Sequence, residues 1–252
     1  MEGRPAYLRI ADELRDQIRA GRYPAGAKLP TMANLSAAYG VSEIVVRQAI
    51  SILRGEGLVE TRRGGGTVVR VLPPVRRVAM DRYRLETEPL NTPATSFTHD
   101  QRISWEEYSL AKVYGQVNAD PELASLFELT PGTRLLRRRF VFYARGEPQQ
   151  LSINYLPWDL VAGTPVANPD REPWPGGTPA QLAFLGRPAT RVEEAVRSRM
   201  PTPRETETLR IAAGVPVLAI TRRMLSDGQV LEVCRDIVIP ADRIILDYAI
   251  DL

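Results

Sequence analysis

The stretch from Gly26 to Val69 constrains the fold of this chain more than any other part of it. Two short helical patterns meet at Gly40-Val41-Ser42, and two β-branched segments follow, separated by Arg-Arg-Gly-Gly-Gly. Glycine permits the left-handed backbone that a tight turn between helices needs. The stretch therefore predicts two helices joined by a tight turn and followed by a β-hairpin, called the wing below.

A third helix precedes this stretch, because apolar residues from Tyr7 to Ile18 recur at helical spacing. Thr31 and Ser42 are suitable N-caps for the two helices that follow. Helices are expected over 6–20, from Thr31 to Gly40 and from Ser42 to Gly55, with strands over 58–61 and 67–69. Three helices and a wing outline a winged helix-turn-helix.

In such a unit the start of the third helix enters the major groove of DNA. Arg47 suits guanine and Gln48 suits adenine, because each side chain can make a two-point hydrogen bond to its base. Arginines beside glycines in the wing can reach phosphate or the minor groove. The residues predicted to contact DNA are Thr31, Ser42, Glu43, Ile44, Arg47, Gln48, Arg62, Arg63, Gly64, Gly65 and Gly66. A purely structural or protein-binding unit is the alternative, and the positive charge of the wing argues against it.

This region resembles the GntR family of bacterial transcription regulators. The matching positions are Tyr7, Ile10, Leu14, Gly21, Tyr23, Gly26, Leu29-Pro30, Leu35, Tyr39 to Ser42, Val46 to Ala49, Leu53, Glu56 to Val59 and Gly64 to Val69. Three positions that usually touch DNA in the family differ here: Ala33 and Glu43 replace arginines, and Gly65 replaces a residue that is often basic or polar. The resemblance implies DNA binding, and the differences leave the operator sequence open.

The charge of the chain is divided unevenly. Residues 1–84 hold 15 Lys and Arg against 8 Asp and Glu, whereas the remainder holds 18 against 22. Positive charge on one domain is what phosphate binding requires, so DNA contact is expected at the N-terminal end.

The remaining composition is that of an ordinary cytoplasmic protein. The single cysteine, Cys234, excludes an internal disulfide and fits a reducing compartment. Charged residues interrupt any N-terminal apolar run, and no run approaches the roughly 20 residues of a membrane span. We expect a cytoplasmic protein that does not cross a membrane and holds no metal.

The second half of the chain mixes strands with helices. Strands are expected over 135–143, 150–155, 195–200, 216–224 and 230–239, with a short helix over 203–211. Asp227-Gly228 favours a tight hairpin turn, so the strands pair antiparallel. The predicted fold class is α+β, with a DNA-binding domain over 1–71, a proline-stiffened linker over 72–80 and a second domain over 81–252.

This second region resembles the UTRA effector domain of the HutC subfamily. The supporting residues are Thr95 to Thr98, Arg137 to Arg139, Gly146 to Pro148, Ser152 to Pro157, Met200 to Pro203, Gly214 to Leu218 and Asp236 to Arg243. The resemblance implies a fold like that of chorismate lyase, with an antiparallel sheet and a cleft for a small effector. It assigns an anion to Ser96, Thr98, Arg137 and Arg139, and an effector hydroxyl to Glu232. Val238 replaces an expected tyrosine, which weighs against a sugar. A solvated strand face is the alternative reading of the arginines.

An enzyme is the main rival function. His99 is the only histidine, and Lys28 and Lys112 are the only lysines, so neither a Ser/His/Asp arrangement nor a fused pyridoxal-phosphate domain is supported. We therefore predict no catalytic residue and no cofactor. The expected protein is a homodimeric repressor that binds a two-fold operator and is released by a small anionic metabolite. A second domain that only dimerises, or one that retains enzyme activity, remains the alternative.

Overall fold

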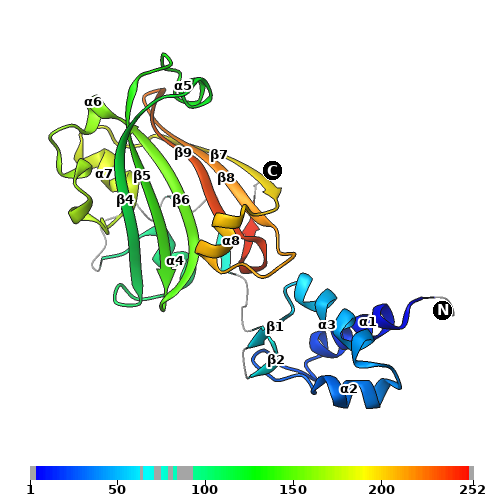
Figure 1. Ribbon diagram of the computed structural model, residues 1–252. Coiled ribbons are helices and arrows are strands. Elements are labelled where there is room, and N and C mark those ends of the chain that lie inside the picture. Colours follow the sequence, from blue (N-terminus) through cyan, green and yellow to red (C-terminus); the bar gives the residue numbers. More distant parts are fainter. Residues whose placement is uncertain (1–3, 63–64, 71–74, 79–81, 84–92, 250–252) are drawn as a thin grey trace. The chain divides into compact units, whose positions relative to one another are not determined.

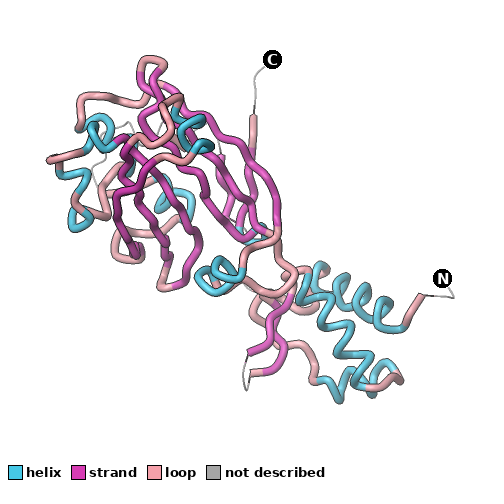
Figure 2. The backbone as a smooth tube through the Cα atoms, turned by 45° about the horizontal axis from the view of Figure 1, so that its top comes forward, coloured by secondary structure: helices cyan, strands magenta, loops and turns pink. Residues whose placement is uncertain are grey.

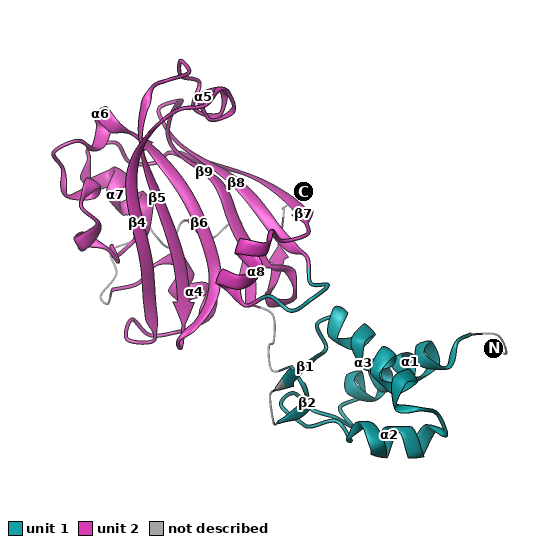
Figure 3. Cartoon of the chain, in the orientation of Figure 1, with its two compact units in different colours: residues 1–73, 211–215 teal, residues 74–210, 216–252 magenta. Residues whose placement is uncertain are grey.

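The computed structural model describes residues 4–62, 65–70, 75–78, 82–83 and 93–249 (Figure 1). The chain forms two compact units, residues 1–73 with 211–215 and residues 74–210 with 216–252 (Figure 3).

The first unit is a small helical bundle with a hairpin. Its elements are α1 (Ala6–Arg19), α2 (Met32–Tyr39), α3 (Glu43–Gly55), β1 (Val59–Arg62) and β2 (Gly66–Val69), and the two strands pair antiparallel. Leu14, Val46 and Leu53 are buried in the core between the helices. The Thr31 hydroxyl accepts a hydrogen bond from Asn34 N at 3.2 Å, which starts α2, and Gly40 ends this helix with φ of 63°. The expected winged helix-turn-helix is confirmed.

The second unit is built on one antiparallel sheet (Figures 1 and 2). Its strands are β4 (Tyr108–Asn118), β5 (Arg134–Ala144), β6 (Glu147–Pro157), β7 (Arg191–Arg199), β8 (Val217–Ser226) and β9 (Gln229–Pro240), in the order β4-β5-β6-β9-β8-β7. The helices are α4 (Ser96–Gln101), α5 (Pro121–Phe127), α6 (Trp158–Val161), α7 (Gly177–Phe184) and α8 (Pro203–Leu209), with short 3-10 turns at Pro165–Ala167, Pro169–Arg171 and Ala241–Arg243. The expected α+β class with an antiparallel C-terminal sheet is confirmed.

The two faces of this sheet have different coverings. On one face, Leu136 and Leu156 pack with residues of α6 and α7, and α4 lies on the same side. On the other face, Leu135 and Tyr155 pack with residues of α5, and α8 packs against β6. Successive side chains of a strand point to opposite faces, so a one-residue step along β5 or β6 decides which face a side chain reaches.

The range predicted as a linker contains a strand that the sequence did not reveal. β3 (Val75–Val78) pairs in parallel with β10 (Ile244–Asp247), and both belong to the second unit. Arg77 on β3 is fully buried, which anchors this strand. A segment with two prolines and two arginines carries no strand signal by composition, because its partner strand lies about 170 residues away. The predicted domain boundaries at 71 and 81 stay a prediction.

Candidate functional site

The exposed face of α3 carries the residues predicted to read DNA. Ser42, Glu43, Ile44, Arg47 and Gln48 are all exposed. The opposite face is buried, with Val46, Ala49, Ile50 and Leu53 in the core.

Ile44 is 70% exposed, although a side chain of this size and polarity is usually covered. A surface that presents an exposed isoleucine beside an arginine and a glutamine suits the major groove, where apolar side chains contact the thymine methyl group.

The two ends of α3 are held differently. Arg15 on α1 donates two hydrogen bonds to Glu56, at 2.7 and 2.5 Å, next to the end of α3. At the other end, Ser42 occupies the N-cap position, but its side chain makes no capping hydrogen bond, so the expected cap is wrong in this detail. Within the described residues, neither Glu43 nor Arg47 has a hydrogen-bond or ion-pair partner, so both side chains are available to a ligand.

The wing is described in part. β1 and β2 pair with Thr61 opposite Thr67 and Arg62 opposite Gly66, whose φ of 80° is the left-handed conformation that glycine tolerates. Gly65 lies in the turn. The predicted contacts Arg63 and Gly64 lie outside the described residues. Thr31 is exposed, and its hydroxyl accepts the capping bond that starts α2.

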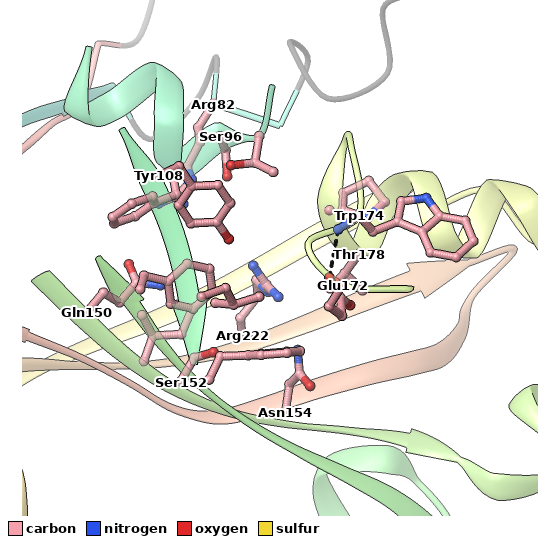
Figure 4. Close-up of a pocket in the computed structure, with 18 residues that line it drawn as sticks. Arg82, Ser96, Tyr108, Gln150, Ser152, Asn154, Glu172, Trp174, Thr178 and Arg222 are labelled. Atoms are coloured by element: carbon pink, nitrogen blue, oxygen red, sulfur yellow. Dashed lines mark hydrogen bonds between the residues drawn. The ribbon is translucent and has the colours of Figure 1, made fainter. Parts of the chain in front are cut away.

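A cavity of about 70 Å³ lies between α4, the helix-covered face of the sheet and the segment 172–179 (Figure 4). Its lining comes from α4, β4, β5, β6, β8, β9 and α7, and comprises Arg82, Thr95, Ser96, Phe97, Tyr108, Leu110, Phe140, Phe142, Gln150, Ser152, Asn154, Glu172, Trp174, Gly177, Thr178, Pro179, Arg222 and Ile237. Figure 4 shows Ser96 and Tyr108 on one side of this space and Ser152 and Asn154 on the other.

Aromatic rings form a large part of the lining. The Phe97 ring lies 5.5 Å from the Tyr108 ring and 5.2 Å from the Phe142 ring, and the rings of Phe140 and Phe142 are 5.9 Å apart. Burial among these rings raises the pKa of the Tyr108 hydroxyl, so it stays protonated and can donate a hydrogen bond. Trp174 adds a further ring to the lining. Such a surface suits a flat apolar group.

The charged residues of the cavity are already paired. Arg222 donates to Glu232 at 2.8 and 3.3 Å, and Glu232 is fully buried. Burial by itself would lower the pKa of Arg222, but the Glu232 carboxylate outweighs this and raises it. Arg82 forms an ion pair with Asp100 at 3.1 Å. The cavity therefore presents hydrogen-bond donors with little excess positive charge.

Arg138 is not itself a lining residue of the cavity, but it forms hydrogen bonds with side chains that are. It is fully buried and donates to Asn154 at 2.9 Å, to Gln181 at 2.6 Å and to Thr178 at 3.3 Å, with Glu172 at 3.8 Å. These contacts join β5 to β6 and α7. Three polar residues at alternate positions of β6, Gln150, Ser152 and Asn154, line the cavity, and this alternation was the sequence signal that the prediction missed.

The predicted effector residues do not gather at one place. Ser96 lines the cavity, whereas Arg137 and Arg139 line a separate groove on the opposite face of the sheet. The prediction that these arginines converge with Ser96 on one anion is therefore wrong. The physical reason is strand alternation, because the side chains that face the cavity from β5 are those of Phe140 and Phe142.

The other two predicted effector residues hold the structure around the cavity. The Thr98 hydroxyl accepts a hydrogen bond from Thr95 N at 2.9 Å, within the capping box that starts α4. Glu232 holds Arg222 and is not among the lining residues. Their effect on a ligand would pass through the residues they hold in place.

A buried polar network connects the cavity to β3. Arg222 lies 3.5 Å from the Tyr83 hydroxyl, which donates to Glu194, and Glu194 pairs with Arg77 of β3. Burial would raise the pKa of Glu194, but the Arg77 charge and the Tyr83 hydrogen bond lower it overall, so this carboxylate is ionised. β3 lies within the range predicted as the linker and begins one residue after the start of the second unit, so the network ends close in sequence to the boundary between the units.

Among the described residues, no three His, Cys, Asp or Glu side chains are grouped as a metal site. The helices that the structure describes include none with the length and apolarity to cross a bilayer.

A winged helix-turn-helix followed by an antiparallel-sheet domain with an internal cavity is the architecture of a DNA-binding transcription regulator. Two family models match this chain: "Bacterial regulatory proteins, gntR family" over residues 6–69 and "UTRA domain" over residues 113–244. The chain belongs to the GntR family and carries a UTRA domain of the kind found in HutC-like regulators.

Similar proteins agree with this assignment. The chain is 29% identical to the mannosyl-D-glycerate transport/metabolism system repressor MngR of Escherichia coli over 94% of this chain and 92% of that protein. It is 24% identical to the histidine utilization repressor of Pseudomonas aeruginosa, over 95% and 88%. Among solved structures, a GntR-family transcriptional regulator matches with 31% identity and a TM-score of 0.64, covering 99% of this chain and 98% of that one.

Proposed function

We propose that this regulator is a repressor that leaves its operator when a small effector occupies the cavity beneath α4. The carrying observation is the network that joins Arg222 at the cavity, through Tyr83 and Glu194, to Arg77 of β3. A ligand that contacts Arg222 differently in two states of the protein shifts the equilibrium between these states. Because Arg77 of β3 belongs to the same network, a rearrangement at Arg222 would change the contacts of β3. The repressor function of MngR and of the histidine utilization repressor supports the sign of regulation.

The DNA contacts proposed for this chain are the exposed face of α3 and the wing. Arg47 and Gln48 would read base edges, with Glu43 and Ile44 beside them, and the arginines of the wing would bind phosphate. We propose that the protein acts in the cytoplasm as a homodimer on a two-fold operator, because the symmetry of a dimer matches that of such a site.

The lining of the cavity argues for an effector with a flat apolar part. Phe97, Phe140 and Phe142 can pack against a ring, while Ser96, Gln150 and the Tyr108 hydroxyl can bond to one or two polar groups. Arg82 and Arg222 each already pair with a carboxylate, so a doubly charged phosphate finds little uncompensated positive charge. An aromatic compound that is neutral or carries one negative charge fits better than a phosphorylated metabolite.

Thermal unfolding in the presence of two sets of compounds tests this class of effector. Aromatic carboxylic acids should raise the midpoint, because a ligand that binds only the native state stabilises it, whereas sugar phosphates should leave it unchanged. A compound that stabilises the protein should also release it from operator DNA, and Phe142→Ala should weaken both effects. Stabilisation by sugar phosphates alone would show that the proposed class is wrong, and stabilisation without release would favour a domain that does not regulate DNA binding.

A further inference from the structure

A second recess lies on the face of the sheet turned away from the cavity. It is a groove of about 360 Å³, lined by side chains of β5, β6, β9 and α8. Arginines reach it from three of these elements: Arg137 and Arg139 from β5, Arg204 from α8 and Arg235 from β9. The groove is within the size range of sites for small molecules, which runs from about 300 to 1,000 Å³.

The positive charge of this groove is not balanced within the protein. Within the described residues, no carboxylate lies within ion-pair distance of Arg137, Arg139 or Arg204. Arg235 is paired with Asp120 at 2.8 Å. Among the described residues, the lining of the groove includes one carboxylate, that of Glu205. It accepts two hydrogen bonds from Arg199, both of 2.7 Å. Three uncompensated guanidinium groups therefore remain around one groove.

The neighbouring charges also disfavour one another. Partial burial lowers the pKa of Arg139, and the positive charge of Arg204 lowers it further. This repulsion destabilises the folded protein as long as no anion is bound, and a bound anion would reverse it. Such an arrangement is the opposite of the cavity, where each cation has a carboxylate partner.

The geometry of the groove suits several oxygen atoms at once. Arg137 and Arg139 project from the same side of β5, and the register places Arg137 beside Tyr155 and Arg139 beside Ile153 of β6. The Thr208 hydroxyl of α8 lies 3.4 Å from Arg139 Nη2. Planar guanidinium groups bind the oxygens of phosphate in pairs, and the hydroxyls of Tyr155 and Thr208 can add hydrogen bonds.

We propose that this groove binds a small anion of at least two charges, of the phosphate or diphosphate type, at a site separate from the effector cavity. The site belongs to the second unit alone and does not depend on the effector proposed above. Its ligand is either a free inorganic anion or the phosphate group of a metabolite, since both present the same oxygens.

Calorimetric titration of the full chain with inorganic pyrophosphate tests the proposal. Wild type should bind one pyrophosphate per chain, and Arg139→Gln or Arg204→Gln should weaken binding by about tenfold or more, because each removes a charged hydrogen-bonding group. Arg134→Gln is the matched control. Arg134 lies on the same strand, is exposed and is not part of the groove, so this variant should bind like wild type. Orthophosphate and a sugar phosphate, titrated in parallel, distinguish a free anion from an esterified one.

Thermal stability gives a second readout, in which the substitution that weakens anion binding should stabilise the anion-free protein. Without an anion, Arg204→Gln should unfold at a higher temperature than wild type at low ionic strength, because the repulsion of Arg139 is removed. Pyrophosphate should then stabilise wild type more than the variant.

Four results would overturn the proposal. Wild type could fail to bind pyrophosphate at millimolar concentration, or Arg134→Gln could weaken the binding as much as the groove variants do. Saturating duplex DNA could abolish the binding, which would assign the anion to the DNA-binding surface. Alternatively, sedimentation could show that Arg139→Gln and Arg204→Gln separate a dimer, which would make the groove an interface between two copies of the chain.

Discussion

At the scale of single residues, Arg47 is the side chain on which recognition of the operator's base sequence is expected to depend most. It is exposed on the face of α3 that carries Glu43 and Ile44. Arg47→Ala should weaken operator binding by about 1–3 kcal/mol and relax the preference at one base pair. Fluorescence anisotropy with operator and random duplexes measures both effects.

Arg54→Ala is the control for that substitution, because Arg54 is exposed near the other end of the same helix. It should leave the preference for the operator unchanged. If Arg47→Ala weakens binding to random DNA as much as binding to the operator, Arg47 contacts phosphate only.

Two neighbouring arginines on β5 should differ sharply in their effect on stability. Arg138 is fully buried and bonded to three side chains, whereas Arg137 is exposed on the opposite face. Arg138→Leu should destabilise the second unit by about 3–5 kcal/mol, because it leaves buried polar partners unpaired. Arg137→Leu should change stability by about 0.5 kcal/mol or less. Equal midpoints in urea-induced unfolding of the two variants would contradict the assignment of faces.

The same strand shows why the predicted effector site was misplaced. From sequence, Arg137 and Arg139 form a pair because alternate residues share a face, and this is correct. Which face the pair occupies depends on the covering of the sheet by α4 and α7, which come from distant parts of the chain. The pattern of β5 alone, with arginines at three successive positions, holds no information about it.

At the scale of elements, the wing provides a test that is independent of α3. Its two strands were expected from their β-branched residues, and the structure confirms them over Val59–Arg62 and Gly66–Val69. Arg62→Ala should weaken binding to every DNA sequence alike and lower the slope of log affinity against log salt by roughly 0.9 for each phosphate that the variant no longer neutralises. An unchanged slope in both Arg62→Ala and Arg63→Ala would remove the wing from the DNA interface.

Elements defined by local signals were predictable, and those defined by distant partners were not. The helices of the first unit and the hairpin of β8 and β9 follow from periodicity, N-caps and an Asp-Gly turn. β3 and β10 pair across most of the chain, so neither carries a pattern of its own. The cavity also escaped prediction, because its lining comes from seven elements that only the folded sheet brings together.

At the scale of the whole molecule, the chain passes from the first unit into the second one residue before β3, and a polar network of the second unit includes a residue of that strand. The network of Arg222, Tyr83, Glu194 and Arg77 ends at β3, the first strand of the second unit. An effector in the cavity and the operator on α3 would then be coupled reciprocally, so that operator DNA weakens effector binding by the same factor.

Tyr83→Phe tests this coupling most directly, because it removes the hydroxyl that connects Arg222 with Glu194 while keeping the ring. The measurement is operator anisotropy of wild type and variant, titrated with a compound that stabilises both against heat. We predict that both proteins bind the operator and the compound with similar affinity, and that only wild type releases the DNA. Equal release by the two proteins would contradict the central claim that the cavity acts on DNA binding through this network.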